Sequence, residues 1–330
     1  MTRPPLGLTM GDPAGIGPEI ILKCFQAGLA PHAVVYGDAA WLERIAMQFK
    51  LKVKVVRTVD PSATLPIGPG FVPVIEACKA VPTTLALGKV SAIAGMAAYQ
   101  SLQRAIDDAL TGKLRAIVTA PLNKQAIHLA GVAFAGHTEI LAHRCGDIPV
   151  AMMLANDAMR VLLVTIHEPL AKVPALITAE LETQAIDLAH RACQQLGISK
   201  PRIAVAGLNP HAGENGQFGD EEIRVIAPAI EAAQRRGIDA SGPWPGDTIF
   251  ARARNGEFDI VVAQYHDQGL IPVKYLGIDE GVNVTVGLPF VRTSVDHGTA
   301  FDIADRGIAS PDSLSRAIAI ACQLSAQTAQ

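Results

Sequence analysis

The sequence predicts a protein of the α/β class. Short apolar segments rich in β-branched residues alternate along the chain with longer segments whose apolar residues recur at helical spacing. Polar residues and glycines gather directly after several of the apolar segments, as they do at the carboxyl ends of strands in open α/β sheets. With 330 residues, the chain is long enough for two such domains, each with its own core.

The segments that we expect to form strands are short and are bounded by turn residues. Residues 150–154 and 161–166 form a predicted hairpin whose turn contains Asn156 and Asp157. The most informative strand is 259–263, because the polar run Gln-Tyr-His-Asp-Gln follows it at once. In chain order, the predicted strands are 6–10, 33–37, 53–56, 116–120, 150–154, 161–166, 202–207, 259–263 and 282–286.

The segments between the strands carry helix signals. Pro18 and Glu19 follow a glycine-rich turn and predict a helix start, and Thr178 is a predicted N-cap. Because the full Gly-x-Gly-x-x-Gly fingerprint is absent, the turn at 11–17 is open to two interpretations, a tight turn or an anion site. In chain order, the predicted helices begin at Pro18, span 91–110, begin at His137, and span 179–196, 220–233 and 313–325.

The composition of the chain argues against nucleic-acid-binding, disulfide-stabilised and membrane-spanning proteins. The net charge is −3, and 49% of the residues are hydrophobic against 18% charged, so the chain offers no basic field for nucleic acid or an acidic membrane. Five scattered cysteines without a Cys-x-x-Cys pair indicate a reducing compartment. No apolar run has the length of a membrane span, and the amino terminus lacks a signal-peptide pattern. We therefore expect a cytoplasmic globular protein.

Three histidines occupy equivalent places, because His167, His211 and His266 each follow an apolar strand-like run. Strand ends converge in α/β sheets, so these imidazoles are predicted to bind one divalent metal ion and to leave it open positions. The alternative is that each histidine only hydrogen-bonds its own loop. Asp247 and Asp267 are predicted to orient the imidazole rings.

A second group of residues predicts an anion site. Lys274, Asn283 and Arg292 have apolar flanking residues, which is unusual for side chains that only solvate a surface. His137 and Thr138 stand at a predicted helix start, where they present donors to an anion or serve only as a cap. A metal ion beside an anion site suits a substrate with a hydroxyl and an acidic group. These residues alone leave hydride transfer, metal-assisted hydrolysis and aldol cleavage open.

Long motifs across nearly the whole chain resemble the 4-hydroxythreonine-4-phosphate dehydrogenase family of vitamin B6 synthesis, including its threonate and erythronate 4-phosphate branch. Residues 15–19 and 297–304 also resemble, more distantly, the isocitrate and isopropylmalate dehydrogenases. The motifs that carry the resemblance are 9–19, 136–139, 207–214, 265–269 and 292–300. Residues 119–124, Glu168, Gly246 and Asp247 are closer to the second branch, which leaves the substituent at substrate C2, amino or hydroxyl, open.

The resemblance implies two α/β/α domains with a cleft between them, and a homodimer whose active site takes residues from both subunits. The first domain would span 1–130 plus about 297–330, and the second, with the metal ligands and dimer interface, about 131–296. The implied residues are His167, His211 and His266 for the metal; His137, Thr138, Lys274, Asn283 and Arg292 for the substrate; His297, Gly298, Thr299, Ala300 and Asp302 for the cofactor; and Lys274, Asp247 and Asp267 for catalysis.

The resemblance also implies a reaction. NAD or NADP would oxidise the 3-hydroxyl of 4-phosphohydroxy-L-threonine with one zinc, magnesium, manganese or cobalt ion per site, and decarboxylation would give 3-amino-2-oxopropyl phosphate. The alternative is the same chemistry on D-threonate or D-erythronate 4-phosphate, which gives dihydroxyacetone phosphate. More remote are a cis-dihydrodiol dehydrogenase and a non-redox transferase on a similar scaffold.

Overall fold

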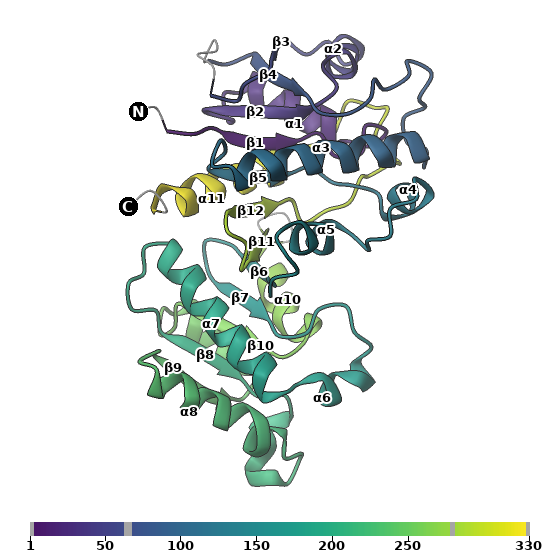
Figure 1. The fold of residues 1–330 in the computed structure, drawn as a ribbon. Coiled ribbons are helices and arrows are strands. Elements are labelled where there is room, and N and C mark those ends of the chain that lie inside the picture. Colours follow the sequence, from purple (N-terminus) through teal and green to yellow (C-terminus); the bar gives the residue numbers. More distant parts are fainter. Residues whose placement is uncertain (1–2, 63–67, 278–280, 328–330) are drawn as a thin grey trace. The chain divides into compact units, whose positions relative to one another are not determined.

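The computed structural model describes residues 3–62, 68–277 and 281–327, and it confirms the predicted α/β class (Figure 1). Contacts divide the chain into two compact units. Unit 1 comprises Met1–Ile148 and Leu288–Ala326, and unit 2 comprises Pro149–Gly287. Among the described residues, no helix combines the length and the apolar character that crossing a membrane requires.

Unit 1 is built on parallel strands in the order β3-β4-β2-β1-β5-β12. The central strands are fully buried, which explains their near-continuous apolar sequence. Helix α3 packs against β1, β2 and β5. The strands are β1 (Leu6–Thr9), β2 (Ala33–Gly37), β3 (Lys54–Thr58), β4 (Phe71–Glu76), β5 (Ala116–Thr119) and β12 (Val291–Ser294). The helices are α1 (Gly17–Gln26), α2 (Ala39–Gln48), α3 (Ala92–Leu110), α4 (Lys124–Leu129), α5 (His137–Arg144) and α11 (Asp312–Gln327).

Unit 2 has the strand order β11-β6-β7-β10-β8-β9, in which β11, β6 and β7 pair antiparallel and β7, β10, β8 and β9 pair parallel. The strands are β6 (Ala151–Ala155), β7 (Arg160–Leu163), β8 (Ile203–Ala206), β9 (Ala240–Trp244), β10 (Ile260–Ala263) and β11 (Val282–Val286). The α-helices are α6 (Val173–Leu176), α7 (Ala179–Gln195), α8 (Ala227–Arg235), α9 (Ile249–Arg254) and α10 (His266–Tyr275). Shorter helical turns span Leu170–Lys172, Pro210–Gly216 and Glu222–Ile226.

The predicted hairpin and the predicted first helix are confirmed. The β6–β7 turn is held by Asn156, whose Oδ1 accepts hydrogen bonds from the amides of Ala158 and Met159, each at 2.9 Å. The helix start needs its glycine, because a Cβ on Gly17 would lie 2.4 Å from the carbonyl oxygen of Met10. Close backbone approach therefore fixes the sequence of this turn, and this part of the structure supports the tight-turn interpretation.

Some elements differ from the predictions. Strand β4 contains Pro73 and strand β9 contains Pro243, and prolines hide strands from pattern analysis because proline cannot donate to a ladder. The predicted helix 220–233 begins as a π turn at Glu222. The polar run after β10, whose local structure was not predicted, leads directly into helix α10, which begins at His266.

The division into units lies at 148/149 and 287/288, whereas the predicted boundaries lay at about 130/131 and 296/297. The physical reason is pairing between segments far apart in sequence: β12 pairs with β5 of unit 1, and Arg144 at the end of α5 forms an ion pair with Asp107 of α3. Among the predicted substrate residues, His137, Thr138 and Arg292 therefore belong to unit 1, and Lys274 and Asn283 belong to unit 2.

Candidate functional site

In unit 1, three chain segments meet at the carboxyl ends of the parallel strands β1, β5 and β12. The first is the turn after Thr9, the second follows Thr119, and the third follows Ser294. Ligands of open α/β sheets bind at this edge. The third segment carries the predicted cofactor loop, and the predicted substrate residue Arg292 lies within β12, just before that segment.

Arg292 is the buried cation of this edge. Its side chain lies on β12 with 3% exposure, and its Nη2 donates a hydrogen bond of 2.7 Å to Oγ1 of Thr119. Burial lowers the pKa of Arg292 to about 9, while Glu139 acts to raise it, so the guanidinium keeps its charge at neutral pH. A buried guanidinium at a strand end is suited to bind a phosphate or carboxylate through two parallel hydrogen bonds.

His137 begins helix α5 close to Arg292. Burial lowers the pKa of His137 well below its usual value, and the charges of Arg292 and Lys124 lower it further. The imidazole is therefore neutral at physiological pH and presents one N–H as a donor. Thr138 follows it in the first turn of the same helix. Free backbone amides at this helix start add to the anion-binding character of the edge.

Lys124 is a member of this cluster that the predicted site residues did not include. It begins helix α4 five residues after Thr119, the last residue of β5, and its Cε lies 3.6 Å from where a Cβ on Gly136 would be. The signal was present in the sequence, because a lysine after a buried strand marks the rim of a site. What the sequence did not show is that α4 and α5 bring Lys124 and His137 together. We refer to Arg292, His137, Thr138 and Lys124 as the anion cluster.

The predicted cofactor loop packs against the turn before α1. The carbonyl oxygen of Thr299 accepts a hydrogen bond of 3.1 Å from the amide of Ile16, and a Cβ on Gly15 would lie 2.9 Å from that oxygen. Nearby, burial raises the pKa of Asp12 to about 6, although the amide of Ala14 acts to lower it. Gly298 faces open space, since no atom lies within 4 Å of a Cβ built on it. The backbone here can be approached closely, which fits a nucleotide.

The remaining predicted cofactor residues lie on the exposed side of this loop. Nδ1 of His297 lies 2.9 Å from the carbonyl oxygen of Gly298. Ala300 adopts a φ of 43°, which turns the chain toward the exposed Asp302. The loop is thus anchored at Thr299 and open on either side of it.

In unit 2, the three predicted metal ligands follow neighbouring parallel strands. His167 follows β7, His266 follows β10 and His211 follows β8, and β10 pairs with both of the other two strands. The structure therefore places all three histidines at one edge of the sheet. Two of them also lie close together: the ring centroids of His167 and His266 are 5.7 Å apart, with an angle of 38° between the ring planes.

The pair of His167 and His266 fits a shared metal ion. Two imidazoles that ligate one zinc ion through bonds of about 2 Å have ring centroids roughly 5–6 Å apart, which is the separation seen here. Nδ1 of His266 lies 2.7 Å from Oδ1 of Asp267. That contact occupies one ring nitrogen and leaves Nε2 as the nitrogen that could ligate a metal ion, which is the arrangement expected of an orienting carboxylate.

His211 lies on a strained turn. Residues 211–215 all have positive φ, between 43° and 79°, and four of the five are not glycine. The buried carboxylate of Glu222 anchors the chain just before this turn, because its Oε1 accepts hydrogen bonds from the amides of Leu208 and Asn209 at 2.8 and 2.7 Å. Strain of this kind persists only where the surrounding structure enforces it, and it is frequent at functional sites.

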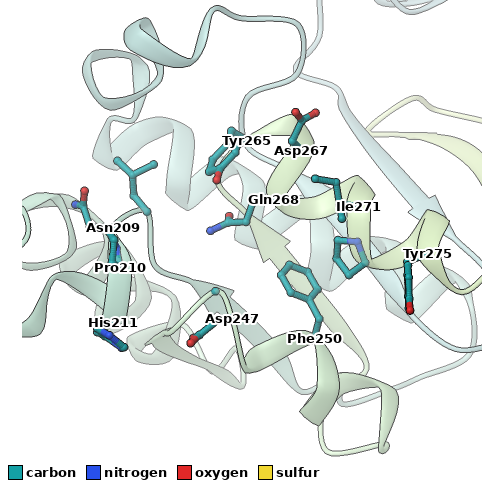
Figure 2. A pocket seen from close by; sticks show the side chains of 13 residues that line it. Asn209, Pro210, His211, Asp247, Phe250, Tyr265, Asp267, Gln268, Ile271 and Tyr275 are labelled. Atoms are coloured by element: carbon teal, nitrogen blue, oxygen red, sulfur yellow. The ribbon is translucent and has the colours of Figure 1, made fainter.

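A cavity of about 680 Å³ lies beside the turn (Figure 2). His211 and Asp247 line one part of it, and Tyr265, Asp267 and Gln268 line another. Asp247 is exposed on the loop before α9, Lys274 lies in the last turn of α10, and Asn283 lies on β11 with its Nδ2 3.1 Å from Sδ of Met152. Within the described part of this single chain, no three His, Cys, Asp or Glu side chains are arranged to hold a metal ion. One chain thus assembles a pair of the predicted ligands.

The buried Glu182 of α7 is expected to make the free energy of unfolding depend on pH. Burial raises its pKa to about 8, while the side chain of Gln264 acts to lower it. Between pH 4.5 and 8 the folded state keeps the proton that the unfolded chain has lost, so rising pH favours unfolding. Glu182→Gln is expected to raise the free energy of unfolding by about 2–3 kcal/mol at pH 7, with a gain that vanishes toward pH 4.5.

Urea unfolding of wild type and Glu182→Gln at pH 5, 6, 7 and 8 measures this difference, and Glu180→Gln on the exposed face of α7 controls for the lost charge. A stability difference that does not change with pH would show that Glu182 is ionised in the folded protein.

Comparison with known proteins assigns the chain to a family. The family described as "Pyridoxal phosphate biosynthetic protein PdxA" matches residues 30–321. This chain is a member of the PdxA family. The predicted family is thereby confirmed.

Named PdxA relatives cover almost the entire chain. This chain is 53% identical over 327 residues to a 4-hydroxythreonine-4-phosphate dehydrogenase from Beijerinckia indica subsp. indica. The alignment covers 98% of this chain and 96% of the relative. It is 49% identical over 323 residues to a D-threonate 4-phosphate dehydrogenase from Salmonella typhimurium, with 97% and 98% covered. The crystal structure of a 4-hydroxythreonine-4-phosphate dehydrogenase from Klebsiella pneumoniae superposes with a TM-score of 0.90 at 43% identity, covering 98% of each chain. These names confirm the predicted enzyme class, a dehydrogenase.

Proposed function

We propose that this PdxA-family protein oxidises the 3-hydroxyl of 4-phosphohydroxy-L-threonine with NAD or NADP and a divalent metal ion, and that the oxidised product is decarboxylated to 3-amino-2-oxopropyl phosphate. The observation that carries the proposal is the anion cluster around the buried Arg292, at the strand ends of a chain with 53% identity to a dehydrogenase of that name. A phosphorylated hydroxy acid matches such a cluster because its phosphate needs a desolvated, bidentate cation.

A second substrate has an observation of its own. D-threonate 4-phosphate is the substrate named for a relative with 49% identity, and D-threonate or D-erythronate 4-phosphate would react at the same hydroxyl to give dihydroxyacetone phosphate. These compounds share the phosphate, the hydroxyl and the carboxylate with hydroxythreonine phosphate. The anion cluster therefore supports both readings, which differ in the substituent at C2.

Each group of residues has a role in this proposal. Arg292 would bind the phosphate, the neutral His137 would donate an N–H to it, and Thr138 and Lys124 would complete the shell. Asp267 would hold the tautomer of His266, while Asp247 and Lys274 would serve near the reacting carbons as proton carriers. Asn283 would hydrogen-bond a polar group of the substrate.

Two groups would come from solution. A divalent ion held by His167, His211 and His266 would stabilise negative charge on the hydroxyl oxygen, and a nicotinamide held near 297–302 would accept hydride from C3. We propose that the ion's three ligands are completed where two copies of the chain meet in a homodimer, since one chain assembles the pair His167 and His266. The scattered free cysteines support a cytoplasmic location.

A steady-state comparison tests the proposed function. The protein is stripped of metal with a chelator, supplied with zinc, magnesium, manganese or cobalt, and offered each of the three phosphorylated acids with NAD or NADP. We expect reduced nicotinamide to form, with hydroxythreonine phosphate giving the highest kcat/KM by at least about tenfold. A higher value for threonate or erythronate phosphate would select the second substrate. The absence of nicotinamide reduction with all three would overturn the proposal.

A further inference from the structure

Two glutamine side chains bind the carboxyl end of β8. Nε2 of Gln264 donates a hydrogen bond of 2.8 Å to the carbonyl oxygen of Ala206, the last residue of the strand. Nε2 of Gln268 donates one of 2.7 Å to the carbonyl oxygen of Gly207, the next residue. The paired register of β8 with β10 ends at Val205. The two amides therefore bind β8 where its pairing with β10 stops.

The same glutamines join β10 to β7. Oε1 of Gln268 accepts a hydrogen bond of 2.7 Å from the amide of Gln264. The carbonyl oxygen of Gln264 accepts from Thr165, from its amide at 3.2 Å and from its Oγ1 at 2.7 Å. One connected set of hydrogen bonds thus links the carboxyl ends of β7, β10 and β8.

Each of the three strand ends that these hydrogen bonds join lies just before a predicted metal ligand in the sequence. His167 is two residues after Thr165, His266 is two residues after Gln264, and His211 is four residues after Gly207. Because so few residues separate these points from the histidines, a shift of the backbone there is expected to move the imidazole rings as well. Metal sites depend on such outer contacts, because ligands must be held close to their productive geometry.

The hydrogen-bond network of these glutamines lies largely in the interior of the protein. Gln264 has 0% exposure, and the fully buried Glu182 of α7 lies against its side chain. Gln268 is half-buried and lies at the centre of Figure 2, with its amide directed toward the loop that carries Asn209 and His211. Buried amide networks of this kind specify one arrangement of the chain, because leaving a member unsatisfied costs free energy.

We propose that Gln264 and Gln268 are positioning residues that fix the three strand ends of each chain, so that His167, His211 and His266 are each held in the orientation in which they bind the metal ion shared between two subunits. This inference rests on the proposed function. Neither glutamine touches the ion or the substrate in this role. Their effect is expected in the affinity and geometry of the metal site.

Gln268→Met tests the proposal with little change in volume. We expect the dissociation constant for zinc, measured by competition with a chelator of known affinity, to rise by about 10- to 100-fold. With cobalt in place of zinc, the visible absorption bands of the ion should shift or weaken, because they report ligand geometry. The melting temperature without metal should stay within about 3 °C of wild type, since Gln268 is half-buried.

Gln268→Glu provides a second variant. It keeps an acceptor for the amide of Gln264 but loses the donor to Gly207, so it should weaken zinc binding in the same way if the link to β8 matters. Gln234→Met is the matched control, because Nε2 of Gln234 also donates to a backbone carbonyl, that of Ala240 at 2.8 Å. Ala240 lies at the amino end of β9, whereas the histidines follow the carboxyl ends of their strands. Gln234→Met should leave zinc affinity and the cobalt spectrum unchanged.

The outcomes separate this inference from the proposed function. Wild-type zinc affinity and an unaltered cobalt spectrum in both Gln268 variants would overturn the positioning role and leave the proposed function standing. A wild-type protein that binds neither zinc nor cobalt would instead overturn the metal-dependent function itself. A loss of melting temperature without metal, with affinity and spectrum preserved, would show that the glutamines serve only the fold.

Discussion

Arg292→Met is expected to lower kcat/KM for the phosphorylated substrate by about two to three orders of magnitude, or about 3–4 kcal/mol. The guanidinium is buried at a strand end, fixed by Thr119 and charged at neutral pH. Its interaction with a phosphate would therefore be desolvated and geometrically fixed, and methionine offers neither charge nor donor. Arg292→Lys should recover only part of the loss, because an ammonium cannot form the two parallel hydrogen bonds.

The stability of the variant distinguishes a binding role from a folding role. Burial of the Arg292 charge costs free energy, as the lowered pKa indicates, so methionine should leave the melting temperature of the ligand-free protein unchanged or raise it. Inorganic phosphate should stabilise the wild type by mass action and should not stabilise Arg292→Met.

Arg115→Met is the matched control for this prediction. Arg115 immediately precedes β5, at the opposite end of the strand from Thr119, and burial also lowers its pKa. It should retain both turnover and stabilisation by phosphate. Arg292→Met with wild-type kcat/KM would remove Arg292 from the substrate site.

The parts of the site that follow strand ends could be predicted from the sequence. Apolar runs locate the ends of β7, β8 and β10, and the residue type that follows each run is histidine, so their common edge follows from the geometry of parallel sheets. The contact of Asp267 with His266 is also local, since the residues are adjacent in sequence. Local patterns of this kind need no knowledge of the packing.

Features set by packing could not be predicted. The pairing of Thr119 with Arg292 joins residues far apart in sequence, and β12 was hidden because its sequence, Val-Arg-Thr-Ser, contains no apolar run. The positive φ values of His211 and Glu214 contradict local preference, and Glu222 anchors the residues just before this turn from a distant part of the sequence. The boundary between the units moved for the same reason, because long-range pairing with β5 decides where Arg292 belongs.

Mixing two inactive variants is expected to restore activity. His211→Ala and His266→Ala should each lose bound metal and turnover, because each removes one of the proposed ligands. One chain brings His266 together with His167, whereas His211 is not grouped with them among the described residues. If His211 of one subunit completes the site of the other, a mixed dimer contains one site with all three histidines.

Random mixing of the two variants should then give about a quarter of wild-type activity, because half of the dimers are mixed and half of their sites are intact. Activity after denaturation and refolding of the mixture measures this, with each variant refolded alone as the baseline. His143→Ala is the control for loss of a histidine, since His143 forms a similar pair with Asp147 at 3.1 Å on the surface. A mixture as inactive as its components, from subunits shown to exchange, would place His211 and His266 in the same subunit's site. The 211–215 turn would then have to move within that chain, so that His211 joins His167 and His266 as the third ligand.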